Sequence, residues 1–498
     1  MLGGASVLMT GRYVVAALAW VGTIVVVREL TPDDFGRLTT IFSVLGIVGF
    51  IADLRLSRIV LRDVMDADDE QAGRIVGSYV GLRLVIGLVS YAIAMAWVLL
   101  SGYPSDLVMG TAVAGLNLIV LSLAFGIILL FEARLWLRSL AAGNVIGQFV
   151  QFVFTIAIAA SGLASIIWFS WVAVANGVAV LVWVFVVARR VAKFQIGFDT
   201  SQWWAWMREA APLALGAALD TIYFRIDIIM LSLLDTYQAV ATYGVAYKFS
   251  DLLGAIPLAV GTPALAMLIA SWPDDPARFR KTFRHAFIIL TVAAMGACAG
   301  FLVFSEHLVT LLYTDRYADA ADAARLLVVG QALHFFTLLA FATLVAAGRN
   351  RLYPIAMLGG VALNVALNLF LIPRYSYLGS GWATVVTEMV VLALLVAGVA
   401  AIPGVRPFPM RAIAKCAVAG VLAAGTGWAL QLALPWYVAA ACTVVVYLGA
   451  VHLLSVDGPG GLRALAGDPR DDVDPRAALE AVMEEGLDSP GPTGGMPG

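Results

Sequence analysis

The sequence predicts an all-α polytopic membrane protein with about fourteen transmembrane helices, arranged as two six-helix lobes plus two C-terminal helices. Hydrophobic residues make up 61% of the 498 residues, charged residues make up 13%, and the mean hydropathy is +0.92. This composition excludes a water-soluble chain. The apolar residues gather in segments of about 20, the length that crosses a bilayer core of about 30 Å. Basic residues gather in alternate loops between these segments.

The individual spans follow from this length criterion. In chain order, the predicted transmembrane segments are residues 5–27, 38–60, 75–100, 107–131, 141–161, 164–188, 211–234, 242–270, 284–304, 321–347, 351–373, 378–402, 410–434 and 436–456.

The distribution of basic residues between the loops predicts the orientation. Loops after even-numbered spans hold most of the Lys and Arg residues, for example Arg62, Arg189 and Arg278. The opposite loops hold only Arg28, Arg37, Arg316 and Arg374. Because Lys and Arg are retained on the cytoplasmic side of a membrane, both termini are predicted to be cytoplasmic.

A weak internal repeat predicts the domain organisation. Phe35-Gly36 and Tyr243-Gly244 each place an aromatic-Gly pair at the start of an even-numbered span. Such repeats are typical of transporters with a central site between two lobes. After residue 455 the chain becomes acidic and rich in Pro and Gly. The predicted domains are an N-terminal lobe of residues 1–190, a C-terminal lobe of residues 191–405, two further helices in residues 406–456, and a flexible cytoplasmic tail of residues 457–498.

The seventh span carries charges inside an apolar segment. Asp220 and Asp227 are seven residues apart and share one helix face. Arg225 points about 140° away from Asp220. Ionisable groups in a bilayer cost several kcal/mol unless they pair or face water, so they indicate a functional site by default. A water-filled cavity explains them at the lowest cost.

Other spans add polar groups of the same kind. The eighth span carries Tyr243, Tyr247 and Lys248. Further intramembrane candidates are Arg12, Arg83, Gln148 and Glu388. Because guanidinium groups bind phosphate oxygens bidentately, the buried cations favour an anionic substrate, phosphate above all.

Structural roles compete with these functional ones. Arg225 and Asp227 also fit an ion pair that joins two helices, and His334 is interpreted as a packed core histidine. Asn364 and Asn368 are interpreted as interhelical hydrogen-bonding residues. The three cysteines have no CxxC spacing and no neighbouring His, so no metal site or cofactor is expected.

Four stretches resemble the polysaccharide and O-antigen flippases of the multidrug/oligosaccharidyl-lipid/polysaccharide exporter superfamily. They are RELTPDDFGRL (28–38), RIDIIMLSLL (225–234), VATYGVAYKFSDLL (240–253) and NVALNLFLIPRYSYLGSGWATVVTE (364–388). Two departures stand out. Arg55 replaces a usual Gly, and Ser376 and Tyr377 intervene before Gly379, where the family has a Gly soon after the Pro-x-Tyr turn.

The resemblance implies a flippase of the cytoplasmic (inner) membrane that is not an enzyme. Its implied substrate is a polyprenyl-diphosphate-linked oligosaccharide, moved by alternating access of the two lobes for surface polysaccharide export. Implied partners are membrane lipids, a glycan polymerase and glycosyltransferases. We expect Arg12, Arg83, Arg225 and Lys248 to neutralise the diphosphate and sugar acids, with Tyr243, Tyr247 and Gln148 contacting sugar. Protonation of Asp220, Asp227 or Glu388 is expected to couple transport to an ion gradient.

Three alternatives remain open at this point. A lipid II flippase is a close variant of the same function. A cation-coupled drug antiporter of the superfamily should have an acidic cavity, whereas the buried basic residues here at least match the acidic ones. A membrane glycosyltransferase needs a catalytic outer loop, and residues 305–320 contain no DxD motif. The chain has no Walker A sequence, so ATP hydrolysis by this chain is not expected to drive transport.

Overall fold

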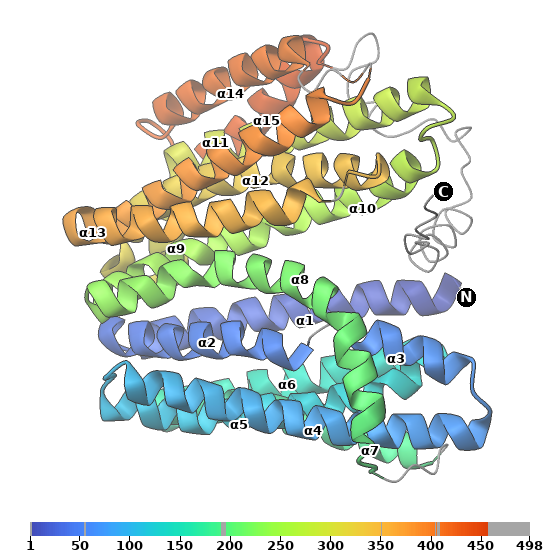
Figure 1. Cartoon of the computed structure of the whole chain (residues 1–498). Helices are drawn as coiled ribbons and strands as arrows, with labels where there is room; N and C mark the ends of the chain where they lie inside the picture. Colours follow the sequence, from blue (N-terminus) through green and yellow to red (C-terminus); the bar gives the residue numbers. More distant parts are fainter. Residues whose placement is uncertain are drawn as a thin grey trace. The chain divides into compact units, whose positions relative to one another are not determined.

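The computed structural model describes residues 2–456 except 54–55, 191–195, 350, 404 and 406–408, and gives the backbone only at residues 2–10, 50–53, 69, 137, 212–213, 215–217 and 220. All regular secondary structure in this part is helical (Figure 1). The predicted tail of residues 457–498 lies outside it. The helices are α1 (Leu2–Glu29), α2 (Pro32–Asp53), α3 (Leu56–Met65), α4 (Asp69–Leu100), α5 (Ser105–Ala133), α6 (Leu137–Ser161), α7 (Ile166–Arg189), α8 (Thr200–Leu234), α9 (Tyr237–Leu253), α10 (Ala255–Ile269), α11 (Pro276–Tyr313), the 3₁₀ helix η1 (Asp315–Tyr317), α12 (Ala320–Ala346), α13 (Leu352–Ala400), α14 (Met410–Leu430) and α15 (Trp436–Leu453).

The described residues include 11 helical segments that are long and apolar enough to cross a membrane. The class predicted from composition, an all-α polytopic membrane protein, is therefore confirmed. One of the 11 segments is α13, which is interrupted at Ser376 (φ 53°, ψ −140°). This break falls between the predicted spans 351–373 and 378–402. Helices α2 and α8 overlap two further predicted spans but are not among the 11. The total of fourteen spans stays a prediction.

The second predicted span, residues 38–60, is wrong at its end. Helix α2 stops at Asp53, and the separate helix α3 begins at Leu56. In α3, Leu56, Ile59, Val60 and Val64 are buried. Their spacing is that of a short amphipathic helix with one apolar face. The predicted span extended into α3 because the apolar residues of this helix follow directly on those of α2 in the sequence.

Two other boundaries differ from the sequence prediction. Helix α11 runs from Pro276 to Tyr313, well beyond the predicted 284–304, so most of the expected outer loop of residues 305–320 is helical. The predicted span 242–270 divides at Gly254 into α9 and α10. Pro257 lies in the first turn of α10, where its missing N–H costs no hydrogen bond.

The chain forms two compact units. The first contains Met1–Gly244, Leu312–Tyr317 and Asn368–Tyr377, and the second contains Val245–Leu311, Ala318–Leu367 and Leu378–Gly498. By its contacts, α8 belongs to the first unit. The boundary between the two predicted lobes, at residue 190, was based on the internal repeat and stays a prediction.

In the first unit, α5 packs against α4 and α7, α6 packs against α1 and α7, and α2 packs against α8, α5 and α4 (Figure 1). Both glycines of the predicted repeat lie at a helix crossing. A Cβ at Gly36 of α2 would overlap the backbone carbonyl of Tyr237 at the start of α9. A Cβ at Gly244 of α9 would lie 3.0 Å from the Thr39 side chain of α2. The two aromatic-Gly pairs therefore allow α2 and the start of α9 to approach closely.

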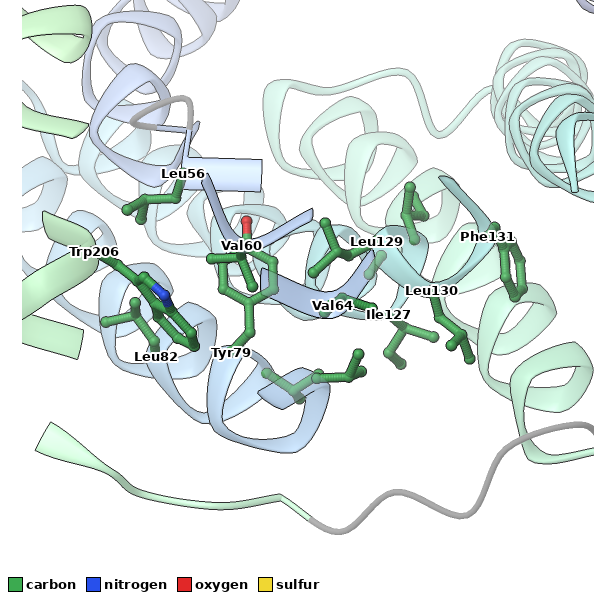
Figure 2. Packing of buried hydrophobic residues seen from close by; sticks show 14 of the residues in the cluster. Leu56, Val60, Val64, Tyr79, Leu82, Ile127, Leu129, Leu130, Phe131 and Trp206 are labelled. Atoms are coloured by element: carbon green, nitrogen blue, oxygen red, sulfur yellow. The ribbon is translucent and has the colours of Figure 1, made fainter. Parts of the chain in front are cut away.

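A hydrophobic core in the first unit joins α3 to its neighbours (Figure 2). Leu56, Val60 and Val64 of α3 pack with Tyr79 and Leu82 of α4, with residues 127–131 of α5, and with Trp206 of α8. The amphipathic face of α3 is thus buried by the unit. This core fixes the position of the start of α8, which carries a polar cluster described below.

In the second unit, α14 packs against α15 and α10 packs against α12. A core cluster combines Ile288 of α11 with small residues of α14, including Cys416 and Ala419, and with Tyr447 of α15. The hydroxyl of Tyr447 donates to the carbonyl of Val292 at 2.6 Å. Small side chains at the contact let the helices approach, as is usual within membranes.

Candidate functional site

Asp227 of α8 lies at the centre of a buried polar cluster in the first unit. Asp227 is only 2% exposed. The hydroxyl of Tyr243 donates to Oδ2 at 2.8 Å, and Nδ2 of Asn368 donates to Oδ1 at 2.9 Å. Burying a carboxylate without partners costs far more than burying a hydrogen-bonded one. The cluster therefore joins α8, α9 and α13 through a single carboxyl group.

The turn between α8 and α9 explains why Asp227 and Tyr243 meet. Helix α8 ends at Leu234, and Thr236 caps α9 by accepting a hydrogen bond from the Ala239 N–H at 3.2 Å. Such a side-chain cap is typical of a helix start. The two helices are thus joined by a short turn, and residues 16 apart in sequence reach one another across it.

Arg225 and Lys248, two of the predicted cations, are half-buried. Arg225 lies on α8 beside Gly46 of α2. A Cβ added to Gly46 would lie 3.9 Å from Nε of Arg225. Lys248 lies on α9 in the second unit, close in sequence to Tyr247, which is buried. Arg12 lies on α1 and is exposed. The groups expected to bind anions therefore differ widely in accessibility.

Arg83 is the most deeply buried of these cations, at 1% exposure on α4. Its Nε donates to the Tyr79 hydroxyl at 2.8 Å. The guanidinium carbon lies 5.0 Å from the centre of the Tyr79 ring and 5.7 Å from the centre of the Phe125 ring. Both rings are within the range of cation–π attraction. Arg83 thus has partners inside the first unit that compensate for its burial.

Gln148 lies on α6 and is buried. Asp220 lies on α8, but its side chain is outside the described part of the chain.

Among the described residues, no group of three or more His, Cys, Asp or Glu residues could hold a metal ion.

Glu388, the last predicted coupling residue, forms a second buried cluster inside the second unit. Its Oε1 lies 3.0 Å from Nδ1 of His334, and its Oε2 accepts a hydrogen bond from the Thr337 hydroxyl at 3.1 Å. His334 and Thr337 come from α12, and Glu388 comes from the part of α13 beyond Ser376. Ser250 donates to Gln331, one turn before His334, at 3.1 Å. A buried polar stripe therefore runs along α12.

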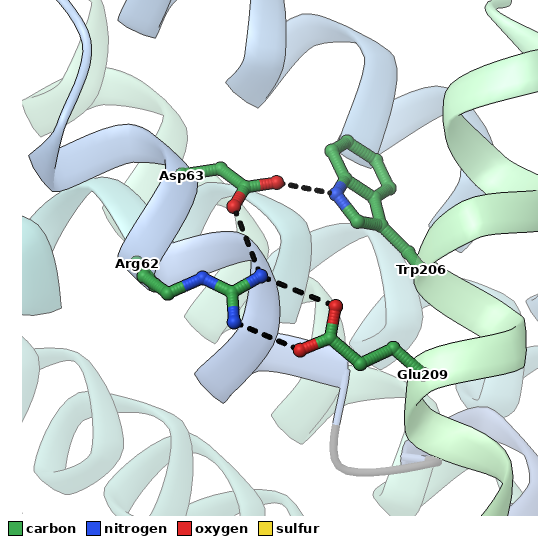
Figure 3. Close-up of polar contacts among 4 residues, drawn as sticks. All are labelled: Arg62, Asp63, Trp206 and Glu209. Atoms are coloured by element: carbon green, nitrogen blue, oxygen red, sulfur yellow. Dashed lines mark hydrogen bonds and ion pairs between the residues drawn. The ribbon is translucent and has the colours of Figure 1, made fainter. Parts of the chain in front are cut away.

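A third polar cluster joins α3 to the start of α8 (Figure 3), and its Arg62 and Glu209 are exposed. Nη1 and Nη2 of Arg62 donate to Oε1 and Oε2 of Glu209 at 2.8 and 3.1 Å. Trp206 Nε1 donates to Asp63 Oδ2 at 2.8 Å. The hydrogen bond to Glu209 raises the pKa of Arg62, which therefore stays charged at any physiological pH. This cluster attaches α8 to the first unit.

Of these residues, Thr337 was not predicted from sequence and His334 was interpreted only as a packed core histidine. The interpretation of Asn368 as an interhelical hydrogen-bonding residue is confirmed by its bond to Asp227. Each lies on an apolar helix, and its partner is a carboxylate far away in the chain. The spacing of Gln331, His334 and Thr337 on one helix face was the available signal.

The described structure is that of a polytopic membrane protein with buried carboxylates and cations among its helices. The sequence model of the family described as "Polysaccharide biosynthesis protein" matches residues 25–322. This match spans more than half of the chain, so the protein belongs to this family. An uncharacterized membrane protein of Methanocaldococcus jannaschii is 25% identical over 177 residues, which is 34% of this chain and 34% of that relative.

Solved transporter structures share the fold. The lipid II flippase MurJ in an inward closed conformation has a TM-score of 0.74 at 12% identity, covering 92% of this chain and 99% of that chain. A multidrug resistance MATE family transporter of the MOP superfamily, in an inward-facing conformation, has a TM-score of 0.63 at 16% identity, covering 77% and 94%. The resemblance to the polysaccharide flippases of this superfamily, predicted from sequence, is confirmed.

Proposed function

We propose that the protein is a flippase that translocates a polyprenyl-diphosphate-linked oligosaccharide across the cytoplasmic membrane, by alternating access, for surface polysaccharide export. The observation that carries this proposal is the match to the polysaccharide biosynthesis family over residues 25–322 in a chain with the fold of superfamily transporters. In this proposal both termini are cytoplasmic, as the basic loops predict.

The cations give the proposal its chemistry. Arg225 and Lys248 are half-buried and Arg12 is exposed, so all three are accessible enough to bind a diphosphate. A guanidinium matches two phosphate oxygens at once, whereas an ammonium acts as a point charge. We assign Arg12, Arg225 and Lys248 to the anionic part of the substrate. The apolar polyprenyl chain would stay in the bilayer.

Burial changes the roles proposed for two other residues. Arg83 is enclosed by Tyr79 and Phe125, so we assign it to support of the first unit. Tyr243 is fully buried and donates its hydroxyl to Asp227, so we assign it to positioning that carboxylate. Gln148 and Tyr247 remain the proposed sugar contacts. Asp220, Asp227 and Glu388 remain the proposed ion-coupling groups.

A lipid II flippase is the second candidate. The coverage of 99% of a lipid II flippase structure favours it over a drug antiporter. A cell-wall precursor and a surface-polysaccharide precursor both suit a site that binds a lipid-linked anion. Depletion separates the two functions: loss of a lipid II flippase stops growth, whereas loss of a surface polysaccharide flippase removes the glycan and leaves growth intact.

Charge reversal tests the proposed anion site. In a glycan-export complementation assay, Arg225→Glu and Lys248→Glu should each abolish export while the protein remains in the membrane. The Glu306→Gln variant, which changes an exposed acid on α11, serves as the control and should export normally. Normal export by both charge-reversal variants would contradict the proposal.

A further inference from the structure

The buried pair of Glu388 and His334 is unusual because both groups can titrate. Their side chains are 3% and 7% exposed, and the atoms that face one another are 3.0 Å apart. Oε2 of Glu388 already accepts a hydrogen bond from Thr337. Both carboxylate oxygens therefore have partners within the second unit.

The charge of this pair depends on a single proton. With a carboxylate and a neutral imidazole, the pair carries one negative charge. One added proton makes it neutral, either as carboxylate with imidazolium or as carboxylic acid with imidazole. A net charge in a low-dielectric interior costs several kcal/mol more than a neutral pair. The proton belongs to the pair as a whole, because two coupled sites titrate together.

The helices around the pair differ in the titratable residues that they carry. Helix α10, which packs against α12, carries no titratable residue. Helix α9, connected to α12 through Ser250 and Gln331, carries Lys248 and Asp251. Helix α11, which contacts α12 through Phe287 and Phe336, carries His285, Arg284 and Lys281 nearest to that contact. Glu388 is the only titratable residue of α13 beyond Leu378.

The donor set favours a proton over a metal cation. A hard cation needs several oxygen ligands without competing donors. Here one carboxylate oxygen faces an imidazole nitrogen and the other accepts from a hydroxyl. Imidazole titrates near neutral pH, where a proton gradient operates.

We propose that Glu388 and His334 together bind one exchangeable proton, and that Thr337 orients the carboxyl group that shares it. The proton comes from water on one side of the membrane when the pair is hydrated. It returns to water on the other side, so no group is consumed. The role of this proton as the coupling ion rests on the proposed flippase function, whereas its binding does not.

Infrared difference spectroscopy tests proton binding without transport. Full-length protein in lipid nanodiscs is titrated between about pH 5 and about pH 8, the range in which histidine titrates. We expect a carboxyl transition in the wild type that is absent from Glu388→Gln. In His334→Gln its midpoint should move by at least about one pH unit, since a neighbouring charge shifts a titration by this amount or more. The matched variant Glu306→Gln should retain the wild-type transition.

An unchanged transition in Glu388→Gln, or an unmoved midpoint in His334→Gln, would overturn the proton site. Both variants keep hydrogen-bonding side chains, and thermal unfolding shows whether they fold. A second measurement uses proteoliposomes, an imposed pH gradient and a fluorescent short-chain polyprenyl-diphosphate sugar. Gradient-driven flipping should be lost in Glu388→Gln and retained in Glu306→Gln. Wild-type protein that shows the infrared transition but flips no lipid would refute the flippase function and leave the proton site intact.

Discussion

The two buried carboxylates, Asp227 in the first unit and Glu388 in the second, have similar exposure but different partners. The donors described for Asp227 are a phenol and an amide, which have no charge to exchange near neutral pH. Glu388 faces an imidazole. Neutral donors stabilise an ionised carboxylate in place, whereas an imidazole shares a proton with it. The comparison sets a carboxylate that accepts from a phenol and an amide against the carboxylate of the proposed proton site.

The largest expected effect separates the two sites by stability. In Asp227→Ala, the Tyr243 and Asn368 donors lose their buried acceptor, so unfolding should become easier by about 2–6 kcal/mol, about 1–3 kcal/mol for each orphaned group. Thermal unfolding of the purified protein measures this loss. Asp227→Asn, which preserves the shape, should lose less stability and still transport poorly. Equal stability of Asp227→Ala and wild type would show that Asp227 is not a central link between helices.

Removal of single hydroxyls sharpens the comparison. Tyr243→Phe and Thr337→Val each delete one hydrogen bond to a carboxylate and should each cost about 1.5–3 kcal/mol. The two variants should differ in how lipid flipping depends on pH. Thr337→Val should shift the pH profile of flipping, because it alters a titrating pair. Tyr243→Phe should lower flipping equally at every pH. The same shifted profile in both variants would remove the distinction between the two sites.

Ser376 lies on α13 between Asn368, which binds Asp227, and Glu388. Its φ of 53° falls in the left-handed region that favours glycine. Such a conformation costs a non-glycine residue about 1–3 kcal/mol. We therefore expect Ser376→Gly to raise the free energy of unfolding by about 1 kcal/mol. Chemical denaturation measures the gain, and a loss of stability would show that the serine side chain has a compensating partner.

The smallest effect is expected at the exposed ion pair of Arg62 and Glu209, whose side chains are 44% and 47% exposed. Glu209→Gln should cost at most about 1 kcal/mol, because solvent screens surface pairs. High salt should reduce this difference further. Unfolding measured at low and high salt tests this. A cost that equals that of Tyr243→Phe and resists salt would contradict the contrast between buried and exposed charges.

Much of the fold follows from the sequence, because apolar segments of bilayer length and the alternation of basic loops are local patterns. The break near Ser376 was predicted from the turn motif. The end of α2 was not predicted, because the apolar residues of α3 read like the continuation of a transmembrane segment. Among the site residues, Asp227 and Glu388 were predicted from their cost in a membrane. Their pairing with Asn368 and His334 was not predicted, because it depends on which helix faces meet, and no local sequence pattern specifies this.

A flipping assay with purified protein in proteoliposomes tests the central claim most directly. The probe is a fluorescent polyprenyl-diphosphate sugar, whose label is accessible to a membrane-impermeant quencher only in the outer leaflet. The account predicts that wild-type protein exchanges the probe between leaflets, and that Arg225→Glu does not. Failure of wild-type protein to move this lipid, combined with transport of a cationic dye, would contradict it.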